Sequence, residues 1–207
     1  MNPSLQSVWF KNTKVTPSKI VCVGRNYAAH IAELNSEVPQ QMVLFIKPNS
    51  SISETLIAAS DEAHHYESEL CFLVKDQQFV AVSFGFDLTK RAIQNKLKDK
   101  GLPWERSKSF DGAALFSQFV ALPKDTSELI VEMTQDGKVI QHGGVELMIH
   151  KPQEVLQEIQ SFVSLQDGDI VMTGTPEGVG ELVKGSDYLG RVLSNEQVLI
   201  EHHWLCQ

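Results

Sequence analysis

Short apolar runs separated by turn residues dominate the chain. The runs have the length and the β-branched or aromatic content of strands, and glycine, proline or polar residues end them. One pair of runs flanks Asp136-Gly137, a dipeptide typical of a tight hairpin. We predict strands at residues 19–23, 43–46, 69–74, 79–84, 129–134, 138–141, 169–172 and 197–200.

Only a few segments have the features of helices. Residues 152–165 repeat apolar side chains at the spacing of an amphipathic helix. Residues 89–100 form a polar segment that ends at Gly101, and residues 26–34 are typical of a short helix. Because short strands outnumber helices, we predict an α+β fold with a mainly β core rather than a doubly wound parallel sheet.

Length and composition indicate one globular domain. The chain has 207 residues, of which 42% are apolar and 21% charged, enough for a full core. The net charge of −8, without a basic run, disfavours nucleic acids and anionic membranes as partners. There is no apolar stretch of membrane-spanning length and no apolar segment typical of a secretory signal. We therefore expect a cytoplasmic protein with Cys22, Cys71 and Cys206 as free thiols.

Acidic residues at two places in the chain carry the first chemical signal. Glu67 and Glu69 alternate along a predicted strand, so both point to one face. Two buried like charges need compensation, and carboxylate oxygens suit hard divalent cations. Asp87 follows the next strand and shares a helical spacing with Arg91 and Gln94. Two simpler interpretations stay open here: a solvated strand edge for the glutamates and a helix N-cap for the aspartate.

Six motifs follow one another between residues 24 and 180. They are GRNYAAHIAE (24–33), LFIKP (44–48), HYESEL (65–70), DLT (87–89), GLPWERSKSFD (101–111) and GDIVMTGTPEGVG (168–180). In this order they resemble the fumarylacetoacetate hydrolase family, specifically its short single-domain members. The resemblance implies that Glu67, Glu69 and Asp87 bind Mg²⁺ or Mn²⁺.

The resemblance also implies an architecture. The family fold is a mixed β-sandwich roll with peripheral helices, usually in a homodimer. We accordingly expect one catalytic domain over residues 19–207 and an N-terminal extension or arm over residues 1–18.

A site with three carboxylates favours a particular class of substrate. Mg²⁺ takes about six ligands, so roughly three positions stay open. A 2-oxo acid can fill them with its carboxylate and its keto oxygen, and such chelation stabilises an enolate when the neighbouring C–C bond breaks. The expected substrates are therefore small 2-oxo acids such as acylpyruvates, fumarylpyruvate-like acids or oxaloacetate.

Further residues are candidates for catalysis and substrate binding. His30 and Glu33 lie three residues apart on one helical face, and the resemblance implies that this dyad activates water as a general base. Outside the motif, such a pair would be an ordinary surface contact. Lys108 can stabilise the negative charge of an enolate, and the family has a matching lysine. Candidates for substrate contacts are Arg25, Tyr27, Lys47, Arg91, Gln94, Gln141 and Thr175.

Three functions are compatible with these residues. The first is divalent-metal-dependent hydrolysis of a C–C bond in acylpyruvate-type 2,4-dioxo acids, giving pyruvate and a carboxylic acid. The second is decarboxylation of oxaloacetate, or isomerisation or decarboxylation of an unsaturated 2-oxo acid in aromatic catabolism. The third is a binding protein without turnover, which the short segment between Glu69 and Asp87 suggests. A retained His–Glu dyad favours an enzyme over the third function.

Overall fold

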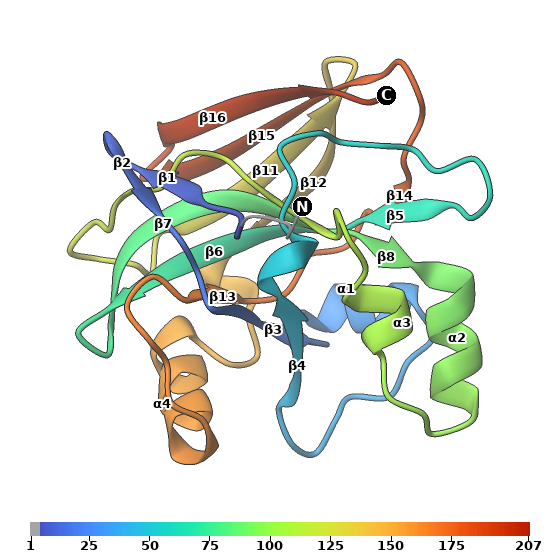
Figure 1. Ribbon diagram of the computed structural model, residues 1–207, viewed down its shortest axis with the longest axis horizontal. Helices are drawn as coiled ribbons and strands as arrows, with labels where there is room; N and C mark the ends of the chain where they lie inside the picture. The colour runs from blue at the N-terminus through green and yellow to red at the C-terminus, as the bar shows by residue number, and fades with distance from the viewer. Residues whose placement is uncertain (1–4) are drawn as a thin grey trace.

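The computed structural model describes residues 5–207, which form two large β-sheets with helices at their periphery (Figure 1). The larger sheet has the strand order β10-β7-β6-β13-β3-β4, and β9 pairs with β7. β13 runs parallel to β3 and antiparallel to β6, so the sheet is mixed. Its strands are β3 (Lys19–Gly24), β4 (Val43–Pro48), β6 (Ser68–Lys75), β7 (Gln78–Asp87), β9 (Ala114–Phe116), β10 (Val120–Ala121) and β13 (Ile170–Met172).

The second large sheet is antiparallel, with the order β12-β11-β15-β16. Asp136 and Gly137 both have positive φ, +50° and +81°, and this confirms the predicted hairpin between the first two of these strands. The other pair, β15 and β16, turns through Asn195 and Glu196. The four strands are β11 (Leu129–Gln135), β12 (Lys138–Gly144), β15 (Asp187–Ser194) and β16 (Gln197–Leu205).

The main core lies between the two large sheets. Phe72 and Phe84 on the first sheet belong to one buried cluster with Val131 and Tyr188 on the second. Burial of each large apolar side chain contributes about 2 kcal/mol. Gly190 lets the sheets approach, because a Cβ there would lie 2.5 Å from the Phe84 ring. The observed sandwich confirms the mixed, mainly β fold predicted from the sequence.

Helix α4 (Pro152–Phe162) covers the outer face of the larger sheet (Figure 1). Its buried residues Val155, Leu156 and Ile159 pack with Val21 and Val171 of the sheet. The Glu154 side chain accepts a hydrogen bond from the Lys151 backbone N–H, which caps the first turn. The amphipathic spacing predicted this helix, which ends three residues earlier than expected.

One predicted helix begins later than expected. Residues 89–90 pair with β5 as a short strand, so the helix starts at Arg91 and its N-cap is Lys90. Asp87 is the last residue of β7, and the N-cap alternative for this residue is therefore wrong. The strands of the third sheet are β5 (His64–Tyr66), β8 (Thr89–Lys90) and β14 (Gly180–Glu181). The remaining helices are α1 (Ala28–Glu33), α2 (Arg91–Asp99), α3 (Glu105–Lys108), and the 3₁₀ turns η1 (Asn49–Ser51) and η2 (Val145–Leu147).

The N-terminal segment forms a hairpin, β1 (Val8–Phe10) and β2 (Thr13–Val15). Val8 is buried in a cluster with Ile20 and Phe119, so residues 8–15 pack onto the domain. The predicted boundary at residue 18 stays a prediction, and residues 1–4 lie outside the described part of the chain.

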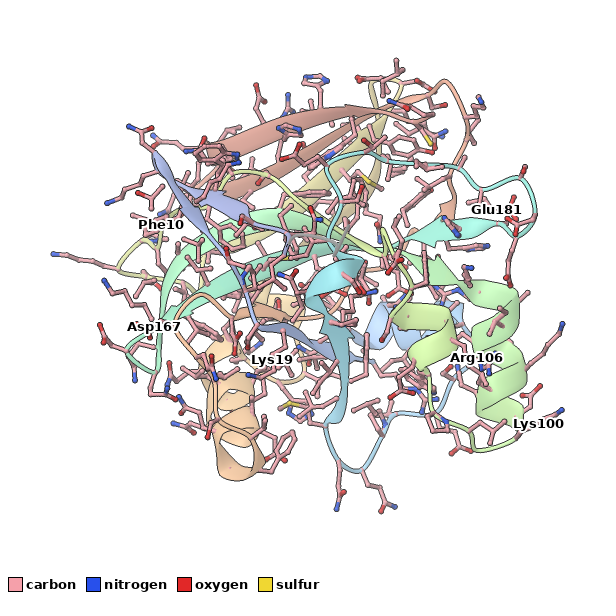
Figure 2. All side chains as sticks on the ribbon, viewed as in Figure 1. Phe10, Lys19, Lys100, Arg106, Asp167 and Glu181 are labelled. Carbon is pink, nitrogen blue, oxygen red and sulfur yellow. The ribbon has the colours of Figure 1, made fainter. Side chains whose placement is uncertain are left out.

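The cysteines lie in the interior, and many charged side chains lie on the surface. All three cysteines are buried and free, as predicted. Within residues 5–207, none of the helices has the length and apolar character needed to cross a membrane. Charged side chains such as Lys100 and Glu181 project from the periphery (Figure 2).

Candidate metal and substrate site

Three acidic side chains meet where β5, β6 and β7 come together. Glu67 occupies the break between β5 and β6, Glu69 lies in β6, and Asp87 ends β7. The Asp87 backbone N–H donates to the Glu67 carbonyl at 2.8 Å, and this bond fixes the two positions against each other. One carboxylate oxygen from each residue lies within 4.8 Å of the others, and all three residues are buried. The structure thus brings together the three ligands predicted from two separate stretches of sequence.

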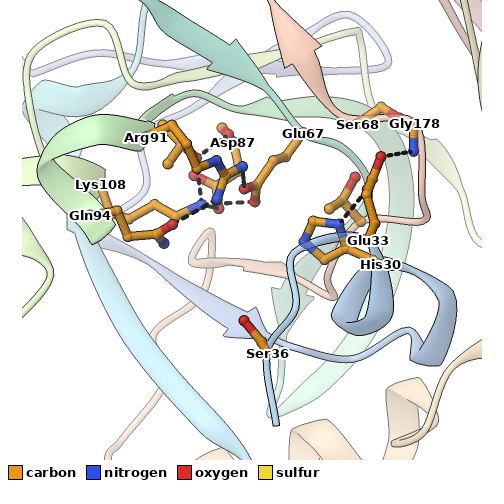
Figure 3. A network of polar contacts seen from close by, with 12 residues as sticks. His30, Glu33, Ser36, Glu67, Ser68, Asp87, Arg91, Gln94, Lys108 and Gly178 are labelled. Carbon is orange, nitrogen blue, oxygen red and sulfur yellow. Dashed lines mark hydrogen bonds and ion pairs between the residues drawn. The ribbon is translucent and has the colours of Figure 1, made fainter. Parts of the chain in front are cut away.

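Three cations surround these carboxylates. Lys108 Nζ donates to Glu67 Oε2 at 2.8 Å and to Asp87 Oδ2 at 2.6 Å. Arg91 donates to Glu67 Oε1, and Lys47 Nζ lies 2.8 Å from Asp87 Oδ1. The close-up in Figure 3 shows Arg91, Lys108 and Gln94 gathered on one side of the site.

The network shifts the pKa values of Glu67 and Glu69 in opposite directions. Burial alone would raise the pKa of Glu67, but Lys108 and Arg91 outweigh burial and hold this pKa well below its usual range. Burial, reinforced by the charges of Asp87 and Glu67, raises the pKa of Glu69 well above its usual range. Burial opposes the charge on Lys108, yet Asp87 and Glu67 raise the pKa of its ammonium.

These features fit a hard divalent cation. Glu69 is a buried acid whose charge the protein's own cations do not offset, and a cation beside it would do so. Asp87 Oδ1 lacks an aligned hydrogen bond within the described chain, although Lys47 Nζ is close. A site made only of carboxylate oxygens favours Mg²⁺ or Mn²⁺ over softer metals.

The predicted dyad lies on the opposite side of the site (Figure 3). His30 Nδ1 lies 3.2 Å from Glu33 Oε2, and both residues belong to α1. Glu33 Oε1 also accepts a hydrogen bond from the Gly178 backbone N–H at 3.0 Å, which ties the helix to the loop before β14. The His30 side chain is nearly buried, with 7% of its surface exposed.

A cavity of about 30 Å³ is lined by His30 and by the cations Arg91 and Lys108. Predicted site residues that line it are Arg25, His30, Glu67, Arg91, Gln94 and Lys108. The sequence analysis missed other lining residues: Gly24, Ile31, Leu34, Ser36, Phe45, Lys98 and Trp104. Several of these belong to matched motifs, so the motifs were the available signal, but Leu34, Ser36 and Lys98 lie outside them.

Seven predicted residues lie outside the lining of this cavity: Glu33, Glu69 and Asp87, together with the four substrate candidates Tyr27, Lys47, Gln141 and Thr175. Lys47 is fully buried and donates to the Lys108 carbonyl, so it positions Lys108 and Asp87. Gln141 accepts from the Ser68 backbone N–H at 2.9 Å and donates to Thr175 Oγ1 at 2.9 Å, which braces the acidic strand. Burial and nearby acids raise the pKa of Tyr27, which is 2% exposed. Substrate binding by these four residues stays a prediction.

A backbone turn supports the second glutamate. The Gly174 backbone N–H donates to Glu69 Oε2 at 2.6 Å, and Gly174 itself has a φ of +96°. A Cβ there would lie 2.8 Å from Asn26 Cβ, so both the conformation and the space require glycine. The motif at residues 168–180 therefore orients Glu69.

Comparison with known proteins identifies the family. Residues 19–202 match the family described as fumarylacetoacetate (FAA) hydrolase C-terminal. This match spans most of the chain, so the protein belongs to the fumarylacetoacetate hydrolase family. The six sequence motifs had predicted this membership.

Individual relatives narrow the class. The chain is similar to the mitochondrial oxaloacetate tautomerase oaa1 of Schizosaccharomyces pombe, with 38% identity over 199 residues, covering 86% of this chain and 90% of the relative. It is also similar to the oxaloacetate tautomerase YcgM of Escherichia coli, with 36% identity over 188 residues, covering 82% and 86% of the two chains. A crystal structure of fumarylpyruvate hydrolase from Pseudomonas aeruginosa, in complex with Mn²⁺ and pyruvate, matches with a TM-score of 0.88. Its identity is 25%, and the match covers 100% of this chain and 97% of that one. The homodimer and the cytoplasmic location stay predictions.

Proposed function

We propose that this protein is a divalent-metal-dependent enzyme that interconverts the keto and enol forms of oxaloacetate. One observation carries the proposal: three buried acids form one cluster, and Glu67 of this cluster lines the same cavity as His30 of the His–Glu dyad. The acids suit a hard cation that chelates a 2-oxo acid, and the dyad suits proton transfer. Two relatives named oxaloacetate tautomerases support the choice of substrate.

The metal site would be formed by Glu67, Glu69 and Asp87. A Mg²⁺ or Mn²⁺ bound there would polarise the keto oxygen of the substrate. The Mn²⁺ in the structure of the fumarylpyruvate hydrolase relative supports a divalent ion of this kind.

The protein's own residues would move the proton. Glu33 accepts the Nδ1 proton of His30, which leaves Nε2 as the basic nitrogen. This nitrogen takes a proton from C3 of the substrate, and the C–H electron pair becomes the C2–C3 double bond. Lys108 and Arg91 contribute the positive charge that stabilises the enolate oxygen. Return of the same proton from His30 Nε2 to that oxygen completes the enol and restores the neutral imidazole, and the reverse sequence restores the ketone without consuming any reagent.

A second candidate function, hydrolysis of acylpyruvates, would use the same metal site and the same His–Glu dyad. The same dyad can activate a water in the cavity, and a similar fold occurs in the fumarylpyruvate hydrolase relative. The water would attack the acyl carbonyl, and the C–C bond would break to release pyruvate and a carboxylic acid. Decarboxylation of oxaloacetate, or isomerisation of an unsaturated 2-oxo acid, would pass through the same type of enolate.

One assay separates these functions. The purified protein is mixed with enol-oxaloacetate and Mg²⁺, and the loss of enol absorbance is measured in parallel with pyruvate release. A tautomerase accelerates the loss of enol without releasing pyruvate, and a chelator abolishes the acceleration. A decarboxylase releases pyruvate from oxaloacetate, whereas an acylpyruvate hydrolase releases it only from acetylpyruvate. Unchanged enol decay with Mg²⁺ would overturn the tautomerase proposal. Glu105→Gln removes an exposed acid that does not line the cavity, and this control variant should behave like the wild type in the assay.

A further inference from the structure

Two cations at the mouth of the cavity take no part in the network around the acids. Arg25 and Lys98 line the cavity and also the groove outside it. Within residues 5–207, neither side chain forms an ion pair with a carboxylate, in contrast to Arg91 and Lys108. Both mouth cations are therefore available to an anion that enters the cavity.

The backbone holds Arg25 in place. Its φ is +58°, a left-handed conformation that an arginine rarely adopts. The next residue, Asn26, fixes this turn, because its side chain donates to the Thr173 carbonyl at 2.8 Å and to the His150 carbonyl at 2.9 Å. A strained conformation that neighbouring bonds maintain is typical of a functional position.

Lys98 reaches the mouth from the last turn of α2. Its Nζ donates to Ser36 Oγ at 3.1 Å, which links α2 to the segment after α1. Burial, followed by the charges of Arg25 and Arg91, lowers the pKa of Lys98, and the charges of Asp99 and Glu67 offset only part of this effect. The ammonium thus lies near two other cations, a position that an anionic ligand would relieve.

The charges of the site indicate what kind of ligand it suits. Two of the three inner acids, Glu67 and Asp87, pair with the inner cations Lys47, Arg91 and Lys108, whereas Glu69 pairs with none of them. A divalent metal adds two positive charges to this set, and Arg25 and Lys98 add two more. A ligand with a single carboxylate would leave the mouth cations unpaired. Glu37 and Asp99 line the outer groove but not the cavity itself.

We propose that Arg25 and Lys98 bind the second carboxylate of the substrate, so that the enzyme prefers dicarboxylic 2-oxo acids over monocarboxylic ones. The inference rests on the proposed function, since the 2-oxo carboxylate and keto group must occupy the acidic end of the cavity. Lys98 is then a specificity-determining residue and Arg25 its partner. Guanidinium and ammonium groups both form strong charge-assisted hydrogen bonds with carboxylates.

Binding of two unreactive acids tests this inference independently of turnover. 2-Oxoglutarate and 2-oxovalerate have the same carbon count, but only the first ends in a second carboxylate. Calorimetric titration of the Mn²⁺-loaded protein should show about tenfold tighter binding of 2-oxoglutarate. Lys98→Gln should reduce this preference to about twofold or less and leave the affinity for 2-oxovalerate unchanged. Lys98→Arg should keep it.

Lys100→Gln is the matched control, because it removes the same charge from the exposed end of α2 (Figure 2). It should keep the wild-type preference. Equal affinity of the wild-type protein for the two acids, or an unchanged preference in Lys98→Gln, would overturn the inference and leave the proposed function standing. Failure of both acids to bind the metal-loaded wild type would overturn the inference together with the proposed function.

Discussion

Lys108 Nζ lies 2.6 Å from Asp87 Oδ2 and donates a hydrogen bond to it. The same ammonium also contacts Glu67 at 2.8 Å, so one buried cation of the protein bridges two of the three candidate metal ligands. The carboxylates are thereby held close together before any ion binds. A divalent cation and Lys108 would both neutralise the charges of Glu67 and Asp87.

Lys108→Met should destabilise the protein, and divalent metal should offset part of the loss. Removal of one partner from a buried ion pair costs about 3–5 kcal/mol, because the remaining carboxylates are uncompensated. Mn²⁺ would neutralise the same carboxylates. Denaturant unfolding of the variant in chelator and in saturating Mn²⁺ measures both effects. An equal loss under the two conditions would contradict a shared role of Lys108 and the metal.

Glu69→Gln should increase the stability of the metal-free protein and weaken its binding of metal. In the absence of metal, burial and the neighbouring acids raise the pKa of Glu69, so its charge opposes folding. The variant should therefore be more stable than the wild type by about 1 kcal/mol near neutral pH. The same substitution should weaken Mn²⁺ binding by at least tenfold. Calorimetry and thermal unfolding in chelator give the two values.

The sign of the pH effect follows from the raised pKa. Below the ordinary carboxyl pKa of about 4.3, Glu69 is protonated in both the folded and the unfolded chain, and the two proteins should be equally stable. As the pH rises above this value, the unfolded chain loses the proton more readily, and the advantage of Glu69→Gln should grow. A constant difference from pH 4 to pH 8 would count against burial of an uncompensated acid.

Part of this site could be predicted from the sequence because it is built from local patterns. Alternation along a strand placed Glu67 and Glu69 on one side, and helical spacing paired His30 with Glu33. The start of α2 could not be predicted in this way, since residues 89–90 are held by pairing with β5. Such long-range pairing overrides local propensity.

Local sequence patterns also could not predict which residues from distant segments line the cavity. Lys98 has the sequence context of an ordinary solvated helix, and only the contact with Ser36 brings it to the cavity mouth. Gln141 is a predicted substrate residue whose amide forms hydrogen bonds with Ser68 and Thr175, and its role in substrate binding stays a prediction. Tertiary hydrogen bonds position both side chains.

His30→Gln should distinguish proton transfer from metal binding. Loss of the general base should reduce tautomerisation of oxaloacetate by roughly 10²–10⁴-fold, while Mn²⁺ affinity stays within about twofold of the wild type. Hydrolysis of acylpyruvates, if present, should fall equally, whereas decarboxylation of oxaloacetate should persist because it needs no activated water. Initial rates on the three substrates measure the pattern. Retention of full tautomerase activity would remove His30 from the mechanism.

Asp169 should be essential for stability but not for the reaction. Its carboxylate accepts hydrogen bonds from the Ser18 and Lys19 backbone N–H groups at 3.0 and 3.1 Å, which joins β3 to β13. Burial opposes the charge, but the Gln166 N–H and the Lys19 ammonium lower the pKa of Asp169. Asp169→Asn should lose about 2–3 kcal/mol near pH 7.

The lowered pKa sets the pH range of that loss. The contribution of Asp169 is fully present above the ordinary aspartate pKa of about 3.9 and disappears as the pH falls through its folded-state pKa. The stability difference between wild type and Asp169→Asn should therefore shrink below pH 4. Asp167→Asn, at an exposed acid of the same loop, should show a smaller loss at pH 7. Equal effects of the two substitutions would contradict the role of the buried carboxylate.

The central claim is that Glu67, Glu69 and Asp87 together hold one divalent cation. Anomalous diffraction from crystals grown with Mn²⁺ tests it most directly. The account predicts one strong peak, with a carboxylate oxygen of each of the three residues at about 2.1 Å. A Mn²⁺ peak elsewhere in the molecule, with these three side chains still joined only to Lys108, Arg91 and Lys47, would contradict it.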